Sequence, residues 1–436
     1  MLHKNSFSFK DFQILLALIL LGLVLAAGLV TLNWWLAGQF GTGADLLPAW
    51  NGARAFLFDN TDPYSQTIAQ ETQRAVYDRV IRTGEYPYAL DVPFPLFLLF
   101  LFPIYLYQFL QMLLPALPVP DASWEIWIRA VWMTLSEVGL VFLVFFSLRL
   151  ADWRPPRWFT VLLLAFALTW SFAASALFDG SFSILLVLAL VGALFAMRDF
   201  RDELAGFLLA ISAMRWEMTL LLWVFLILAV LTARRWRVFS GIGMTWFVLG
   251  VIAFLIYPNW FWPYARAVAA NWRADDILTP ARFLEEWLPN FGANLSLLIV
   301  SLLLLVLVVE WFAALRGKDF RRVVWVFALA IAVTPLLEFS NTFANLAPLV
   351  FSFAFILPFA WERWEKRPYL ILTIIVILFF IFPLGIRYSS IPAFLADGLT
   401  FLLPPVLTLL GLYWIRWYVV RPPRTWLDGV KREVQK

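Results

Sequence analysis

The chain has 436 residues, of which 63% are hydrophobic and only 14% are charged, and its formal net charge is +4. A soluble domain carries about a quarter charged residues, so a water-soluble fold is excluded. Many apolar runs reach the roughly 20 residues with which a helix crosses a bilayer. The bases lie in short loops between these runs, which argues against nucleic acid as a partner. We therefore predict an all-α, polytopic transmembrane bundle, with residues 1–436 as a single integral membrane domain.

Two residue types that carry much enzyme chemistry are missing or nearly missing. Cysteine is absent, which excludes disulfides and thiolate chemistry. The only histidine is His3, in the N-terminal tail. This excludes zinc sites, histidine proton relays and Ser-His-Asp triads, so that acid–base chemistry falls to carboxylates.

The first apolar run covers about residues 13–38 and is too long for a signal peptide, so we expect a retained first helix. The outward loop 38–92 follows, with seven acidic residues against four arginines and with interfacial helices. Asp45 lies near the end of the first helix, where a carboxylate suits a general base acting on a lipid-linked substrate. The alternative role for Asp45 is the N-cap of the next helix. Asp59 and Asp62, in DNTDPY, form either a divalent-cation site or an ordinary turn.

Two apolar stretches do not read as simple crossings. Residues 94–118 are broken by prolines, and a full crossing would place the basic loop 149–157 outside, against the positive-inside rule. A kinked or re-entrant segment, which returns to the side it came from, would remove this conflict with the charge rule. Residues 204–232 have basic flanks at both ends, which predicts two short helices meeting near Arg215.

Ionisable residues between apolar runs are functional candidates by default. Arg215 either grips a phosphate, for which its planar fork is suited, or forms a structural pair with Glu217. Glu137, also within an apolar run, is expected to make a hydrogen bond inside the bundle.

The remaining spans and loops complete a bundle of about 11–13 helices. The second outward loop, 258–293, is again rich in aromatic residues. The basic loops and the tail 421–436 are expected in the cytoplasm, with both termini, in a plasma membrane. Further spans are predicted at 126–149, 157–178, 182–197, 238–257, 294–315, 322–338, 344–361, 368–386 and 397–420.

Three turns that open outward carry polar residues, on the same face as Asp45. A sugar needs several hydrogen-bonding groups in one pocket, and these turns can supply them. They are Asp179-Gly180-Ser181, Asn290 with Asn294 and Ser296, and Glu338 with Asn341 and Asn345.

A sparse pattern over most of the chain resembles the family-87 glycosyltransferases of the GT-C superfamily, which use polyprenyl-phosphate mannose as donor. The resemblance has Ser in place of a family Gln in the turn after Asp179, and Arg215 in place of a Lys. It rests on Asp45, residues 50–56, Asp62-Pro63-Tyr64, residues 92–95, 179–183, Arg215, 294–296 and 334–345.

The resemblance implies an inverting GT-C hexosyltransferase that moves a hexose, such as mannose, from a polyprenyl-phosphate donor to a lipid or glycan acceptor. Asp45 would be the base, and Arg215 would neutralise the departing phosphate. No cofactor is certain, and a divalent cation is possible. A lipid-linked sugar transporter or flippase is the alternative, and a non-catalytic scaffold ranks last. Substrate contacts are expected from Arg215, Asp62, Tyr64, Asp179, Asn294, Glu338 and Asn341.

Overall fold

The computed structural model describes residues 9–40, 42–113, 123–273, 279–317, 319–337, 342–363 and 393–420, and within 364–392 only Leu370, Thr373 and Ile377. These residues form helices and no strand. Seven helical stretches, one of which is the continuous run Asp202–Thr232, are long and apolar enough to cross a membrane, or eight if one bent pair counts as a span. The prediction of an all-α, multi-pass membrane protein is confirmed. The span expected at 368–386 and the tail 421–436 fall almost wholly outside the described residues.

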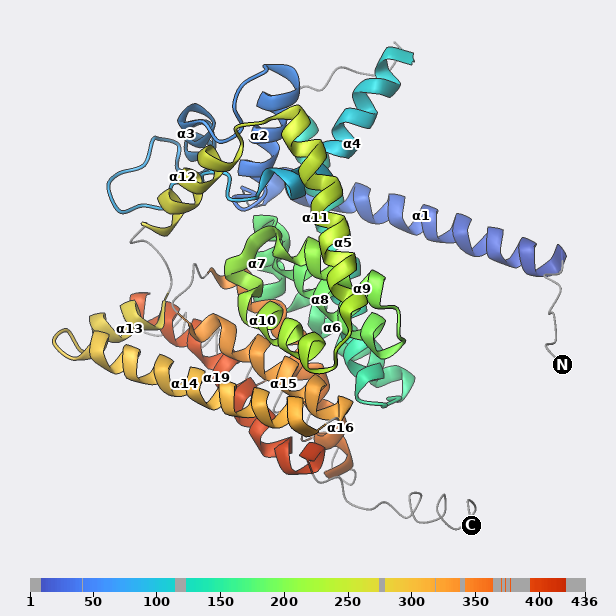
Figure 1. Ribbon diagram of the computed structural model, residues 1–436, viewed down its shortest axis with the longest axis vertical. Coiled ribbons are helices and arrows are strands. Elements are labelled where there is room, and N and C mark those ends of the chain that lie inside the picture. Colours follow the sequence, from blue (N-terminus) through green and yellow to red (C-terminus); the bar gives the residue numbers. More distant parts are fainter. Residues whose placement is uncertain are drawn as a thin grey trace.

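Figure 1 shows the arrangement of the helices. They are α1 (Phe9–Gln39), α2 (Leu47–Phe58), α3 (Gln66–Tyr77), α4 (Phe94–Leu113), α5 (Ser123–Leu150), α6 (Arg157–Thr169), α7 (Ser171–Asp179), α8 (Ser183–Arg198), α9 (Asp202–Ser212), η1 (Ala213–Arg215), α10 (Trp216–Thr232), α11 (Trp236–Ile256), α12 (Phe261–Trp272), α13 (Pro280–Trp287), α14 (Gly292–Gly317), α15 (Phe320–Val333), η2 (Thr334–Leu336), η3 (Phe343–Leu346), α16 (Leu349–Arg363) and α19 (Ala393–Val420).

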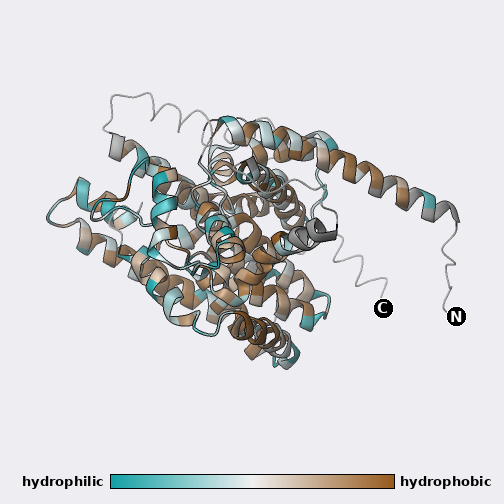
Figure 2. Ribbon diagram, turned by 90° about the horizontal axis from the view of Figure 1, so that it is seen from above, coloured by the Kyte–Doolittle hydropathy of each residue, from teal (hydrophilic) through white to brown (hydrophobic). Residues whose placement is uncertain are grey.

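The periphery of the bundle is apolar. Only 6% of the hydrophobic stretch of α11 and 11% of that of α1 is buried inside the protein. Apolar side chains that face outward along a whole helix are typical of lipid contact. Figure 2 shows the helices of the bundle mostly brown, with hydrophilic teal gathered at helix ends and connections.

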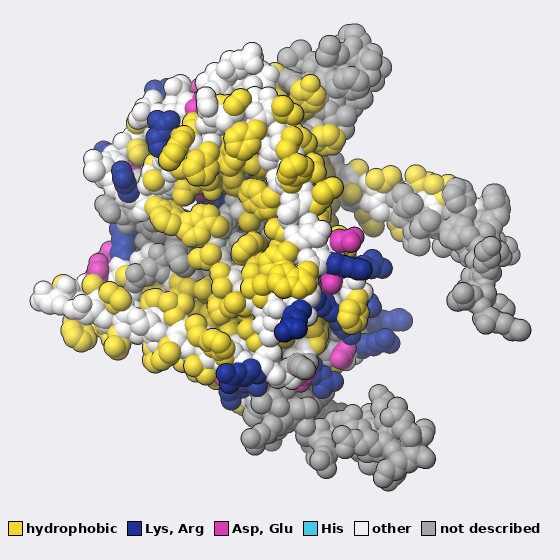
Figure 3. Space-filling model, viewed as in Figure 1, with side chains coloured by type: hydrophobic (Ala, Val, Ile, Leu, Met, Phe, Trp, Pro, Cys, Tyr) yellow, Lys and Arg dark blue, Asp and Glu magenta, His cyan; other side chains and the backbone are white. Residues whose placement is uncertain are grey.

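The two ends of the bundle differ in character. One end, called the Asp45 end, holds the end of α1, helices α2, α3 and α12, and the starts of α8 and α10. The other, called the arginine end, holds the connections after α5, α8 and α10, with Arg149, Arg198 and Arg234. In Figure 3 a dense group of dark blue side chains lies at the lower right, and others lie at the upper left.

The segment from Asp91 to Arg129, which contains α4, begins and ends at the Asp45 end; its residues 114–122 lie outside the described chain. Helix α4 starts directly after Asp91, which belongs to that end because it pairs with Arg215, and Pro103 lies inside the helix. Arg129, near the start of α5, also lies at the Asp45 end. Its Nη2 donates to the Phe40 carbonyl, at the end of α1, over 2.9 Å. Helix α5 then ends at the arginine end, as the charge rule requires.

Helices α9 and α10 form a hairpin with Arg215 at its tip. The 31 residues Asp202–Thr232 would be long enough to cross a membrane as one helix. However, Arg235, three residues past α10, pairs with Asp202, at the start of α9, over 3.3 Å. A straight run of that length would hold its ends about 46 Å apart. The prediction of two short helices meeting near Arg215 is confirmed.

The hairpin is held by a close backbone contact between α9 and α11. A Cβ added to Gly206 would lie 2.2 Å from the Val238 carbonyl oxygen and 2.8 Å from the Cα of Gly241. Only glycines allow helices to approach this closely, and small residues are a common means of helix packing in membranes.

Glu137 behaves as expected. Its Oε2 accepts a hydrogen bond of 2.8 Å from Asn33 Nδ2, which joins α5 to α1 within the apolar region.

Candidate active site

Asp45 is positioned by a short backbone pairing between two loops. The Gly43 amide donates to the Phe178 carbonyl over 3.2 Å, and the Asp45 amide donates to the Asp179 carbonyl over 2.9 Å. Gly180 has a φ of +71°, and a Cβ there would lie 2.7 Å from the Cβ of Leu46. Glycine is therefore needed for both the left-handed conformation and the contact. This turn fixes Asp45 at the head of the bundle.

The side chain of Asp45 does not cap a helix. The N-cap residue of α2 is Leu46, and no side chain caps that helix, so the capping interpretation is wrong. The carboxylate instead faces Arg215, with Oδ1 at 3.8 Å from Nη1. Its Oδ2 is buried and has no hydrogen-bond partner among the described residues.

Burial governs the acidity of Asp45. Removal from water raises the pKa of its carboxyl, the Arg215 guanidinium opposes this, nearby Asp91 raises the pKa further, and Ser181 lowers it. The net direction is upward. A carboxylate in this state holds a proton more readily than an exposed aspartate, as a general base requires.

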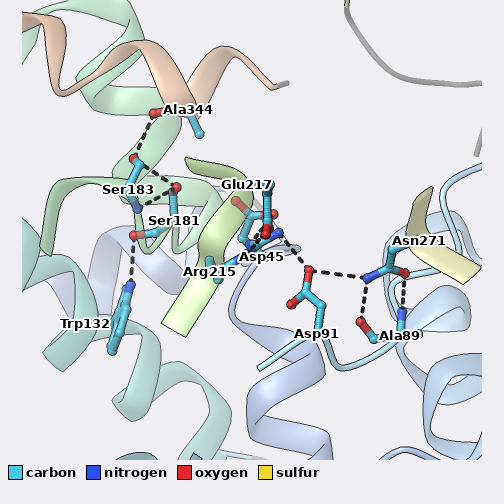
Figure 4. Close-up of polar contacts among 10 residues, drawn as sticks. All are labelled: Asp45, Ala89, Asp91, Trp132, Ser181, Ser183, Arg215, Glu217, Asn271 and Ala344. Atoms are coloured by element: carbon cyan, nitrogen blue, oxygen red, sulfur yellow. Dashed lines mark hydrogen bonds and ion pairs between the residues drawn. The ribbon is translucent and has the colours of Figure 1, made fainter. Parts of the chain in front are cut away.

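Arg215 stands at the centre of three carboxylates (Figure 4). Its Nε donates to Glu217 Oε1 at 2.9 Å, and its Nη2 donates to Asp91 Oδ2 at 3.0 Å. Nη1 makes no hydrogen bond to the described residues and has Asp45 at 3.8 Å. The Arg215 and Glu217 side chains are each 5% exposed, whereas those of Asp45 and Asp91 are 12% and 14% exposed. The pair lies beneath the two aspartates, which reach the surface.

The predicted second outward loop, 258–293, contributes a side chain that holds residues 89–91 in place. Asn271, in α12, exchanges hydrogen bonds with both backbone groups of Ala89, at 3.0 and 2.8 Å. Its Nδ2 also lies 3.3 Å from Asp91 Oδ2. Because Asn271 is buried, this contact fixes the position of residues 89–91 and aims Asp91 at Arg215.

A serine pair lies on the other side of the site. Ser181 Oγ donates to Ser183 Oγ over 3.1 Å, and Ser183 Oγ donates to the Ala344 carbonyl over 3.2 Å. A cavity of about 20 Å³ adjoins this pair and is lined by Glu217, Thr334 and Asn345 among others. That volume suits about one water molecule. Two of the three predicted polar turns, 179–181 and the part of 338–345 that is described, therefore meet here.

Of the other residues predicted to contact substrate, Asp62 and Tyr64 make local contacts, whereas Asp179 lies beside Asp45. Asp62 accepts a hydrogen bond of 2.9 Å from the Tyr64 amide, which forms a turn. The Tyr64 hydroxyl donates to the Val92 carbonyl over 2.7 Å, close to Asp91 in the chain. Asp179 accepts from Ser175 and touches the Asp45 loop.

Of the three remaining predicted residues, only Asn294 lies within the described chain. Asn294 is exposed on the first turn of α14 and makes no hydrogen bond to the Asp45 group within the described chain. Glu338 and Asn341 lie outside the described residues.

Sequence reasoning missed Asp91, Asn271 and two tyrosines. Burial raises the pKa of the Tyr86 hydroxyl, and neighbouring Asp91 adds to it. Tyr88 has a φ of +49°, uncommon for a bulky residue, and its ring meets that of Tyr86 edge-on at 4.9 Å. The motif YPYALD carries both tyrosines and Asp91, and its density of aromatic and acidic groups before an apolar helix was the available signal.

The described residues hold no group of three or more Asp, Glu, His or Cys side chains arranged for a metal ion. The possible cation site at Asp59 and Asp62 is thus not joined by a third carboxylate within the part of the chain that the structure covers.

No protein-family model matches this chain, and neither a curated protein nor a solved structure was found to match it. The chemistry of the site is therefore inferred from its own geometry.

Proposed function

We propose that the protein is a membrane glycosyltransferase that moves a hexose, such as mannose, from a polyprenyl-phosphate donor to a hydroxyl of a lipid or glycan acceptor. The observation that carries this proposal is the incomplete contact between Asp45 and Arg215. Asp45 Oδ2 and Arg215 Nη1 make no hydrogen bond to the described residues, and both lie in a site that is almost closed to water. The Asp45 end would face the outside of the plasma membrane, with both termini in the cytoplasm, since the arginine end follows the positive-inside rule.

Asp45 would act as the general base. Its carboxylate takes the proton of the acceptor hydroxyl, and the oxygen attacks the anomeric carbon of the donor sugar. The bond between that carbon and the phosphate oxygen breaks on the opposite face, which inverts the configuration. The polyprenyl phosphate leaves with the bonding electrons.

Arg215 would balance the charge that develops on the leaving phosphate. Two of its nitrogens are already engaged, by Glu217 and Asp91, so Nη1 is the nitrogen left for a substrate oxygen. The Arg215–Glu217 pair, which was the structural alternative to phosphate binding, is also present. In the proposed site it has a supporting role, because it holds the guanidinium plane toward Asp45.

The first test is transfer by the purified protein in liposomes, with radiolabelled polyprenyl-phosphate mannose as donor and a membrane-lipid extract as acceptor. Asp45→Asn keeps the shape of the side chain and removes the base. We expect it to lower the rate by about 10²–10⁴-fold, the usual contribution of a general base.

Asp78→Asn is the matched control, because Asp78 is an exposed residue at the end of α3 in the left-handed conformation that Asn also accepts. It should transfer at the rate of the unchanged protein. Equal transfer by Asp45→Asn would rule out Asp45 as the base. Movement of the donor across acceptor-free vesicles, with no transfer product from the unchanged protein, would instead support a flippase.

A further inference from the structure

The arginine end contains a large cavity that is separate from the Asp45 site. It has a volume of about 860 Å³ and lies where α8, α10 and α14 end and α15 begins. Leu194, Val230, Leu315 and Val323 contribute an apolar wall. Helix α10, with 17 residues, joins Arg215 to this cavity and is about 26 Å long. The cavity and the Asp45 site are therefore roughly one hydrocarbon thickness apart, about 30 Å.

The rim of the cavity is positively charged. Four arginines and two aspartates line it, which leaves two net positive charges. Arg235 is occupied, since it bonds Asp202 and the Met197 carbonyl. Arg198 is exposed and reaches Asp152 only at 3.9 Å. Arg234 and Arg321 are exposed, and their guanidinium groups have no ion-pair partner among the described residues. Arg234, Arg321 and the loosely paired Arg198 are thus available to an anion.

Aromatic side chains place this rim at the level of lipid headgroups. Phe200 is 80% exposed and Trp236 is 66% exposed, and the Arg235 guanidinium lies over the Phe200 ring at 4.8 Å. Exposed aromatic residues beside bases are typical of the interface between hydrocarbon and water. A second cavity, of about 660 Å³, shares Asp152 and Arg198 with the first and adds Arg149 and Arg154.

We propose that this cavity binds an anionic phospholipid of the inner leaflet. Its phosphate would be held by Arg198, Arg234 and Arg321, and its acyl chains would lie on the apolar wall. Basic pockets between helices on the cytoplasmic side are known to suit acidic headgroups. The volume is that of a site for a drug-sized ligand, far more than a free phosphate ion fills, and the apolar wall would contribute nothing to such an ion.

Native mass spectrometry of the full chain, titrated with phosphatidylglycerol or phosphatidylcholine, tests this proposal. We expect phosphatidylglycerol to bind more tightly than phosphatidylcholine. Replacing Arg198, Arg234 and Arg321 together by Gln should weaken phosphatidylglycerol binding by about tenfold or more, given the usual contribution of each base at a lipid surface. The matched control replaces Arg74, Arg82 and Arg273 by Gln, three exposed arginines at the opposite end.

A second variant tests the cavity itself without a change of charge. Ala233 lines the cavity and is exposed at the end of α10, so Ala233→Trp should fill the entrance and also weaken phosphatidylglycerol binding. Equal weakening by the control triple variant, or equal affinity for the two lipids, would overturn the proposal. Displacement of the lipid by millimolar inorganic phosphate would overturn the lipid assignment in favour of a free anion.

Discussion

At the scale of single residues, the site is organised by one guanidinium group. Arg215 has contacts of 2.9, 3.0 and 3.8 Å to Glu217, Asp91 and Asp45, which come from three separate segments of the chain. If all three carboxyl groups around this one cation were ionised, they would leave an excess of negative charge. That excess favours a proton, or the positive charge that develops on a sugar carbon as its bond to phosphate breaks.

The raised pKa of Asp45 predicts the pH dependence of the reaction. A base works only when ionised, so transfer should fall as the pH is lowered through the pKa of Asp45. Because burial raises that pKa, the fall should occur above the usual aspartate range, which is near about 3.9. The rate of transfer at saturating donor, measured from about pH 4 to 8, checks this. A rate that stays constant down to pH 4 would contradict the assignment.

Arg215 should also matter for stability. Arg215→Ala leaves buried carboxylates without their cation, which costs about 3–5 kcal/mol when a buried pair is broken. The variant removes the group that lowers the pKa of Asp45, so that this pKa rises further above its unfolded value. A raised pKa makes a carboxyl stabilising at low pH, and that contribution is lost as the pH rises.

Arg215→Ala should therefore lose more stability at pH 8 than at pH 5, as thermal unfolding in detergent would measure. A deficit that is the same at both values would count against a buried acidic cluster. Donor binding is better tested with Arg215→Lys, which keeps a positive charge in place.

At the scale of elements, the hairpin of α9 and α10 depends on how closely α9 approaches α11. Backbone atoms of α11 occupy the space that a side chain at Gly206 would need. The same hairpin holds Arg215 at its tip and ends at the cavity of the arginine end. Its placement therefore affects both sites.

Gly206→Ala should displace α9 from α11. We expect a loss of about 1–3 kcal/mol in stability, typical of overpacking, together with slower transfer because Arg215 moves. Gly250→Ala, in α11, is the control, since a Cβ there meets nothing within 4 Å; it should be neutral or slightly stabilising. Melting temperatures of the two variants side by side provide the measurement, and equal melting would contradict the close contact.

At the scale of the whole molecule, apolar run length and composition predicted the fold class. They could not predict contacts between residues that are far apart in the sequence. The all-α, multi-pass bundle and the hairpin at Arg215 followed from apolar length and from the side on which bases must lie. Asp45 and Arg215 were noticed because ionisable groups are costly near hydrocarbon. Asn271 and Asp91 are separated by 180 residues, and no local pattern relates them.

The failed interpretation of Asp45 as a helix cap has a similar cause. Asp followed by a short helix fits a capping pattern locally. The loop pairing with residues 178–180 turns the side chain away from α2 and toward Arg215. A tertiary contact thus decided between two roles that were locally equivalent.

The hairpin also has a consequence for biosynthesis. Its tip carries Arg215 and Glu217 only two residues apart and already paired, so it enters the bilayer as a neutral unit. An unpaired charge passing through the bilayer centre would cost about 2.5–3.5 kcal/mol during insertion. Asp45 and Asp91 precede the tip in the sequence and are made first. The hairpin therefore completes the candidate active site when it inserts, because it brings the paired Arg215 to Asp45 and Asp91.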